Sequence, residues 1–152
     1  MVRKLAVLTL LLAPLACGGD GDGSTGPAQI PDVKGSFVGS LSMTALDNAI
    51  TLRCNVRLAI DSQTGSEWDG IIHFTQSNEL CAAGETDAVS GTINANRQAT
   101  MTLDDSDLAE GCTTFSGSKV FTGSLTGSVL TVSTSTTCDD VSMDIELTVT
   151  RS

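Results

Sequence analysis

From position 35 onward, apolar and polar residues alternate, and this period of two constrains the fold more than any other feature of the chain. In the run Ile50 to Asp61, apolar side chains occupy the even positions, and polar or charged ones occupy most odd positions. In Val141 to Thr150 the apolar residues stand at the odd positions. Successive side chains of a β-strand point to opposite faces, so each run predicts a strand with one buried face and one solvated face.

Eight such segments are separated by turn signals such as Gln63-Thr64-Gly65-Ser66 and Thr126-Gly127-Ser128. No helical period interrupts them, and short links make consecutive strands antiparallel. We therefore predict an all-β fold, an eight-stranded antiparallel up-and-down β-barrel, with a two-sheet β-sandwich as the alternative. The predicted strands are Phe37–Thr44, Ile50–Asp61, Glu67–Gln76, Ala88–Ala95, Gln98–Leu103, Thr113–Leu125, Ser128–Thr134 and Val141–Thr150.

The two ends of this domain carry a short motif. The first strand opens with Gly35-Ser36-Phe37, and the last strand ends with Val149-Thr150-Arg151. This resembles the calycin signature, in which Gly-x-Trp on the first strand meets a basic residue of the last strand at the closed end of the barrel. The resemblance covers three residues, with Phe37 in place of the tryptophan. It implies a lipocalin-like barrel in which Phe37 and Arg151 meet, and it implies no particular ligand.

The inward positions predict a largely filled barrel. An eight-stranded barrel is just wide enough for side chains to fill it or for one small ligand to fit. Large apolar residues dominate the predicted interior, and inward glycines are expected to open space where they cluster. The predicted inward residues are Phe37, Leu41, Met43, Ile50, Leu52, Val56, Leu58, Ile60, Trp68, Ile72, Phe74, Ile93, Met101, Leu103, Phe115, Phe121, Val141, Met143, Ile145, Leu147 and Val149, with glycines at 39, 70, 91, 117 and 123.

The N-terminus predicts export. A positive start with Arg3 and Lys4 precedes the apolar run Leu5 to Ala16, which is too short to span a membrane and is typical of a signal peptide. The sequence Pro14-Leu15-Ala16-Cys17 resembles the lipobox of bacterial lipoproteins. The resemblance implies cleavage before Cys17, lipidation of its thiol, and a place in the bacterial cell envelope, anchored to the membrane and facing the periplasm or the exterior.

The predicted organisation has three parts. Residues 1–16 are the signal peptide, residues 17–34 are the lipidated cysteine and a flexible Gly- and Asp-rich tether, and residues 35–152 are the barrel domain. The formal net charge of the whole chain is −10, and removal of residues 1–16 leaves 6 basic against 18 acidic side chains. Such a surface repels nucleic-acid phosphates, so no nucleic-acid partner is expected. The expected membrane contact is the lipid on Cys17.

The remaining cysteines are an even number in a chain predicted to be exported, which indicates two disulfide bonds. A hairpin turn near Thr126-Gly127 places Cys112 and Cys138 almost opposite each other, so we predict the pairs Cys112–Cys138 and, by default, Cys54–Cys81. There is no Cys-x-x-Cys motif and only one histidine, so neither a zinc site nor a redox pair is expected.

Other polar residues give weaker signals. We interpret His73 as a surface residue, and the acidic run Asp104–Glu110 as a solvated loop whose carboxylates could also hold a divalent cation. Lys119 falls on the inward face by counting, so either a bulge turns it outward or it is a cation in the lumen for an anionic ligand.

We expect no catalytic residues, metal or cofactor. The predicted function is a non-enzymatic binding or interaction domain with an unidentified partner. The alternatives are a carrier of small apolar ligands of the lipocalin type, an inhibitor of a secreted hydrolase, or a structural component of the envelope.

Overall fold

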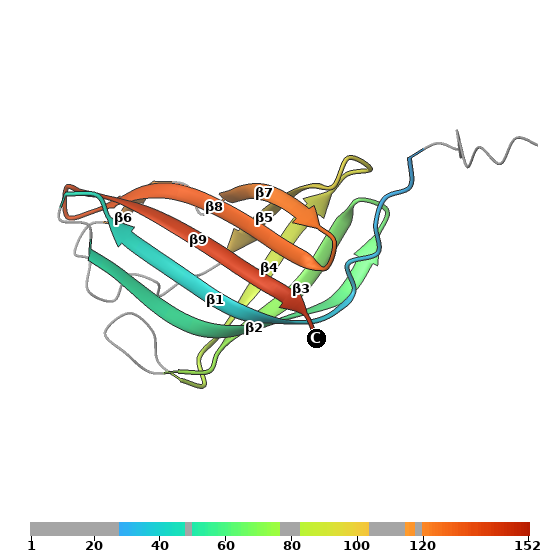
Figure 1. The fold of residues 1–152 in the computed structure, drawn as a ribbon, viewed down its shortest axis with the longest axis horizontal. Helices are drawn as coiled ribbons and strands as arrows, with labels where there is room; N and C mark the ends of the chain where they lie inside the picture. Colours follow the sequence, from blue (N-terminus) through green and yellow to red (C-terminus); the bar gives the residue numbers. More distant parts are fainter. Residues whose placement is uncertain (1–27, 48–49, 77–82, 104–114, 118–119) are drawn as a thin grey trace, which may run out of the picture.

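Eight strands form a closed antiparallel β-barrel with an up-and-down strand order, and the all-β prediction is confirmed (Figure 1). The computed structural model describes residues 28–47, 50–76, 83–103, 115–117 and 120–152. For residues 115–117 it describes the backbone alone. β1 pairs with β2 on one side and with β9 on the other, which closes the sheet. The strands are β1 (Gly35–Ala45), β2 (Ile50–Thr64), β3 (Glu67–Phe74), β4 (Thr86–Ile93), β5 (Gln98–Leu103), β6 (Phe115–Gly117), β7 (Val120–Thr126), β8 (Val129–Cys138) and β9 (Val141–Arg151).

The predicted strand Thr113–Leu125 is divided into β6 and β7. Both pair with β8, but in different registers: Gly117 lies opposite Thr136, and Thr122 lies opposite Ser133. The register against β8 therefore shifts by two residues between β6 and β7. Only β7 also pairs with β5, so β7 completes the barrel and β6 is a short extension at one end. Lys119 lies outside the described residues.

Most predicted inward residues are buried inside the barrel, as the alternation requires. Leu52 and Val141 are half-buried, and the side chain of Phe115 lies outside the description. Some buried residues were missing from the prediction, among them Val89 on β4 and the inward residues of β8. The confirmed core residues are Phe37, Leu41, Met43, Val56, Leu58, Ile60, Trp68, Ile72, Phe74, Ile93, Met101, Leu103, Phe121, Met143, Ile145, Leu147 and Val149.

The prediction for Ile50 was wrong, because 54% of this residue is exposed. Ile50 is the first residue of β2, and its partner Ala45 is the last residue of β1. Both residues therefore stand at the ends of their strands, at the rim of the barrel.

The prediction that inward glycines open space was also wrong at the positions described. A Cβ atom on Gly91 would collide with the indole ring of Trp68 and with the carbonyl oxygen of Thr100. A Cβ atom on Gly39 would collide with the carbonyl oxygen of Thr148. Glycine at these positions lets backbones and a large ring approach closely, as at the tight bends of a barrel.

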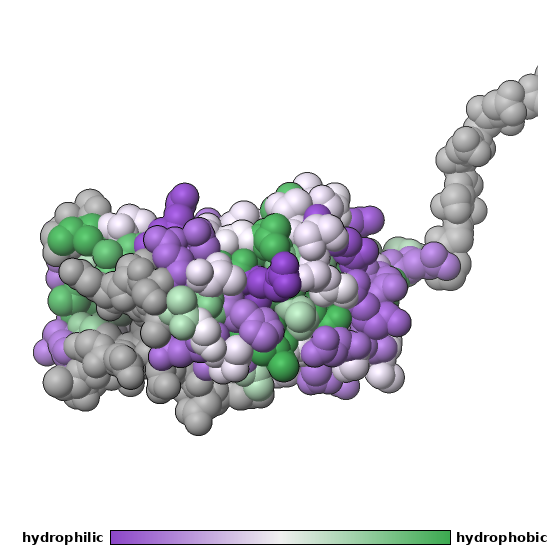
Figure 2. Space-filling view, turned by 90° about the horizontal axis from the view of Figure 1, so that it is seen from below, coloured by the Kyte–Doolittle hydropathy of each residue, from purple (hydrophilic) through white to green (hydrophobic). Residues whose placement is uncertain are grey.

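The outer wall is built largely from small polar residues. Threonine hydroxyls pair across neighbouring strands, at 2.9 Å between Thr44 and Thr51 and at 2.8 Å between Thr92 and Thr100. Such cross-strand pairs on the solvated face add modest stability to an antiparallel sheet. Apolar side chains are scattered among hydrophilic ones on the face seen in Figure 2.

Candidate functional site

One end of the barrel is closed by the chain that leads into β1, the right-hand end in Figure 1. Residues 31–34, which we name the N-terminal strap, lie against this closed end. Arg151 donates a hydrogen bond from Nη2 to the carbonyl oxygen of Asp32 at 2.6 Å. Its guanidinium carbon also lies 5.3 Å from the centroid of the Phe37 ring, within the range of a cation–π contact. Phe37 and Arg151 therefore meet, and the closed barrel is compatible with a calycin-like fold.

Gln63 holds the N-terminal strap from the inside. Its Oε1 accepts a hydrogen bond from the Val33 N–H at 2.8 Å, and its Nε2 donates to the carbonyl oxygens of Pro31 and Gly65, both at 3.0 Å. Val33 is only 2% exposed. The last residues of the predicted tether thus cover the core at this end.

A β-bulge puts Gln63 in position for this contact. Up to Ile60 the even residues of β2 face inward, but the register between β2 and β3 shifts between Ile60 and Ser62. After this shift Gln63 lies opposite the inward residue Trp68. The extra residue of a bulge rotates the strand beyond it, so a polar side chain replaces an apolar one at the closed end.

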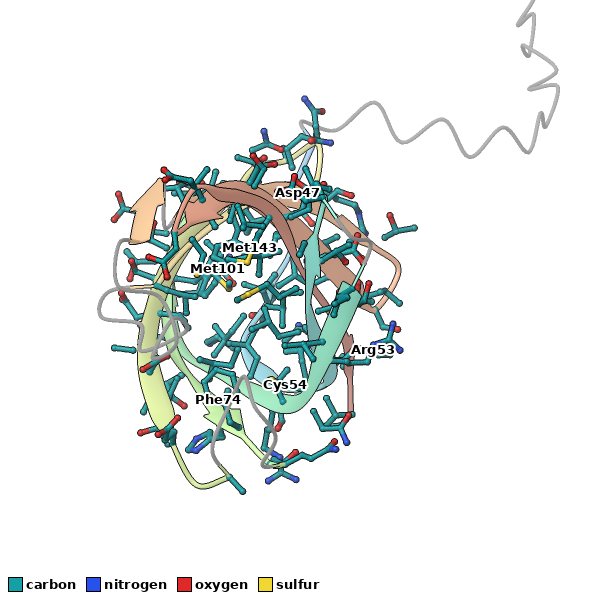
Figure 3. The ribbon with its side chains drawn as sticks, turned by 90° about the vertical axis from the view of Figure 1, so that its left-hand side faces the viewer. Asp47, Arg53, Cys54, Phe74, Met101 and Met143 are labelled. Atoms are coloured by element: carbon teal, nitrogen blue, oxygen red, sulfur yellow. The ribbon has the colours of Figure 1, made fainter. Side chains whose placement is uncertain are left out.

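The opposite end, which we name the open end, carries the longer connections. Three of the connections at this end comprise residues 46–49, 75–85 and 104–114, and the fourth is the short turn 139–140, whereas the closed-end turns are residues 65–66, 94–97 and 127–128. Inside the open end lie Met43 and Met143, which are 5% and 8% exposed, whereas Met101 on β5 is fully buried opposite Gly91. Figure 3 looks into this end and shows Met101 and Met143 directed into the barrel. Thioether side chains are flexible and adapt to irregular neighbours.

The rim of the open end exposes two large apolar residues. Leu46 is 53% and Ile50 is 54% exposed. The N–H of Leu46 donates to the carbonyl oxygen of Ser142 at 2.9 Å, which ties the connection after β1 to the start of β9. Beside Leu46 runs a shallow groove of about 460 Å³, lined also by Thr136, Met143 and Asp144. We name Leu46, Ile50 and this groove the apolar rim.

The structure describes two of the five cysteines. Cys54 is fully buried on β2, Cys138 is partly buried at the end of β8, and both are disulfide-bonded. Cys17, Cys81 and Cys112 lie outside the described residues, so the predicted pairing and the lipidation of Cys17 stay predictions.

The remaining candidates carry no shared site in the described part of the chain. His73 is half-buried on the outer face of β3, in the same cross-strand row as Arg57. The run Asp104–Glu110 lies outside the description. Among the described residues, no group of three or more His, Cys, Asp or Glu side chains is placed to hold a metal ion.

Comparison with models of protein families, with curated proteins and with solved structures found no match. Within the described ranges, no helix is long and apolar enough to cross a membrane.

Proposed function

We propose that this chain is a lipid-anchored protein of the bacterial cell envelope whose barrel binds a protein partner through the apolar rim and performs no catalysis. The observation that carries this proposal is the exposure of Leu46 and Ile50, each more than half exposed, at the end of the barrel with the longer connections. Exposed apolar residues that gather at one place on a soluble domain are typical of an interaction surface.

The position of the N-terminal strap supports an orientation for such a protein. The strap fixes residues 31–34 at the closed end, so a tether from Cys17 reaches the barrel there. The apolar rim lies at the other end of the strands. A lipid on Cys17 would therefore hold the closed end towards the membrane and leave the rim directed away from it, accessible to a partner.

A carrier of small apolar ligands is the second candidate. The buried methionines below the rim favour it, because their side chains can move to admit a ligand. The core counts against it, because large side chains such as Phe37, Trp68 and Phe121 are buried inside a barrel of only eight strands. Binding at the rim needs no cavity, so we place the protein partner first.

The anchor is tested by metabolic labelling with a palmitate analogue in the native cells. We expect label on the wild-type protein and none on the variant Cys17→Ala, because the thiol and the new amine of Cys17 would carry the acyl chains. A label that persists in the variant would rule out the lipidation.

The rim is tested by cross-linking in the native envelope with the double variant Leu46→Ser/Ile50→Ser. We expect one cross-linked species with the wild type that is lost from this variant. The matched control is Ile71→Ser, which removes a side chain that is 39% exposed on the wall of β3, and it should keep the species. If the rim variant and the control retain it equally, the rim is not the binding surface.

A further inference from the structure

A second candidate surface lies on the wall of the barrel, across the outer face of β1, β2 and β3. A groove of about 500 Å³ runs there, lined by residues that include Val38, Gly39, Asn55, Arg57 and His73. β2 lies at the bottom of Figure 1, so the view from below in Figure 2 faces this part of the sheet. The volume falls within the range of roughly 300–1,000 Å³ for small-molecule sites.

Strand register brings the central side chains of the groove together. Arg57 on β2 lies directly opposite Val38 on β1 and His73 on β3, so the three form one row across the sheet. Directly paired residues on one face of a sheet have Cβ atoms about 5 Å apart. The row therefore places the side chain of Arg57 between an apolar side chain and an imidazole ring.

The next row towards the open end adds a further donor, the side-chain amide of Asn55. The side chain of Thr75 donates to the carbonyl oxygen of Asn55 at 3.1 Å, and the N–H of Thr75 donates to the same oxygen at 2.9 Å. These bonds fix the chain after β3 beside β2. The amide of Asn55 projects from the same face of β2 as Arg57, because the two residues are two positions apart.

The charge of this groove is opposite to that of the chain as a whole. The chain has 18 acidic and 8 basic side chains, yet within the described residues no carboxylate forms an ion pair with Arg57. The side chains of Asn55 and His73 likewise make no hydrogen bond in the described part of the chain. Val38 adds an apolar wall that is 43% exposed.

We propose that this groove is a binding site for a small organic anion, a carboxylate or phosphate group that carries a short apolar chain. The planar guanidinium of Arg57 matches the two oxygens of such a group, and the imidazole of His73 and the amide of Asn55 offer further N–H donors. Val38 packs against the apolar part of the ligand. The site is separate from the apolar rim and does not depend on the partner proposed there.

The test is a titration of the purified full-length protein, followed through its backbone amide resonances by NMR. The probes are hexanoate and hexyl phosphate, with hexanol and hexylammonium as controls of the same chain length. We expect saturable shifts at Val38, Asn55, Arg57 and His73 with either anion and none with the two controls. The anion that binds more tightly identifies the headgroup that the site prefers.

Two variants that each remove one positive charge distinguish binding in this groove from general electrostatic attraction of an anion to the protein. Arg57→Gln should weaken hexanoate binding about tenfold, because it removes charge-assisted hydrogen bonds. Arg97→Gln changes an exposed arginine in the turn between β4 and β5 and should leave the affinity unchanged. Equal weakening in both variants, equal binding of hexylammonium, or shifts confined to inward residues of the open end would each overturn the proposal.

Discussion

Gly91 carries no side chain because the indole ring of Trp68 occupies the space where a Cβ atom would lie. The two residues face each other directly across β3 and β4. Trp68 is the single tryptophan of the chain and is 2% exposed. Gly91 therefore marks the position of a large neighbouring side chain and not an empty volume.

Gly91→Ala should therefore destabilise the fold. The added methyl group has no room between Trp68 and the carbonyl oxygen of Thr100, and overpacking of this kind costs about 1–3 kcal/mol. Urea unfolding followed by Trp68 fluorescence measures the change. The control Ser90→Ala, one position away on the outer face, should unfold at nearly the wild-type urea concentration; equal midpoints for the two variants would contradict the close packing.

At the level of the elements, the bulge in β2 decides how the closed end is sealed. It turns Gln63 inward, and Gln63 then supplies three hydrogen bonds to the N-terminal strap and the adjacent turn. Without the bulge, the alternation of β2 would place Gln63 on the outer face. One extra residue in a strand thus connects the N-terminal strap to the core.

Gln63→Ala should loosen the N-terminal strap. The change leaves the Val33 N–H and the Pro31 carbonyl oxygen without their partner, and we expect a loss of about 1–2 kcal/mol. Hydrogen exchange at the Val33 amide, together with urea unfolding, measures both effects. Gln98→Ala, an exposed glutamine at the start of β5, should change neither quantity, and unchanged protection of Val33 in Gln63→Ala would show that the strap is held by other contacts.

The alternation of the sequence predicted the strands well but not their irregularities. It identified the inward faces of β1, β3 and β9, because strict alternation forces one face of each strand into the core. The bulge near Ser62 and the break between β6 and β7 add residues without a change of composition that would mark them. Val33 was assigned to the tether, because the residues before it give no strand pattern. Its burial follows from contacts with Gln63 and with the core, which the sequence does not show.

At the scale of the whole molecule, closure of the sheet was predictable and the location of the surface sites was not. Eight short-linked strands with one apolar face have few other ways to bury that face. The apolar rim and the groove beside Arg57 depend on the spatial register of different strands. Arg57 and His73 are unremarkable in the sequence, and only their common row places them together.

The disulfide pairing is a prediction about the whole molecule, because each bond joins distant parts of the chain. Non-reducing peptide mapping should find Cys112 linked to Cys138 and Cys54 linked to Cys81. Each bond closes a loop of just under thirty residues, which stabilises the fold by roughly 3–4 kcal/mol in the chain-entropy model. A peptide that links Cys54 to Cys112 would contradict this pairing.

A filled barrel should not respond to lipids. We expect the methyl resonances of Met43, Met101 and Met143 to stay unchanged when palmitate is added, because these side chains are buried among others in the core. Met43 and Met143 report on the open end better than Trp68, which lies opposite Gln63 near the closed end. A saturable shift of the methionine signals would place the carrier function ahead of the protein partner.

The N-terminal strap also determines how the molecule responds to mechanical force. In a protein held by a lipid and gripped at the apolar rim, tension passes through the tether to residues 31–34 before it reaches any strand. The bonds from Gln63 and Arg151 would break one after another, whereas the ladders of the barrel would all have to yield together. Release of residues 31–34 would lengthen the tether by at most about 14 Å. The closed end would thus act as a short extensible spring that lets the barrel follow a partner away from the membrane without unfolding.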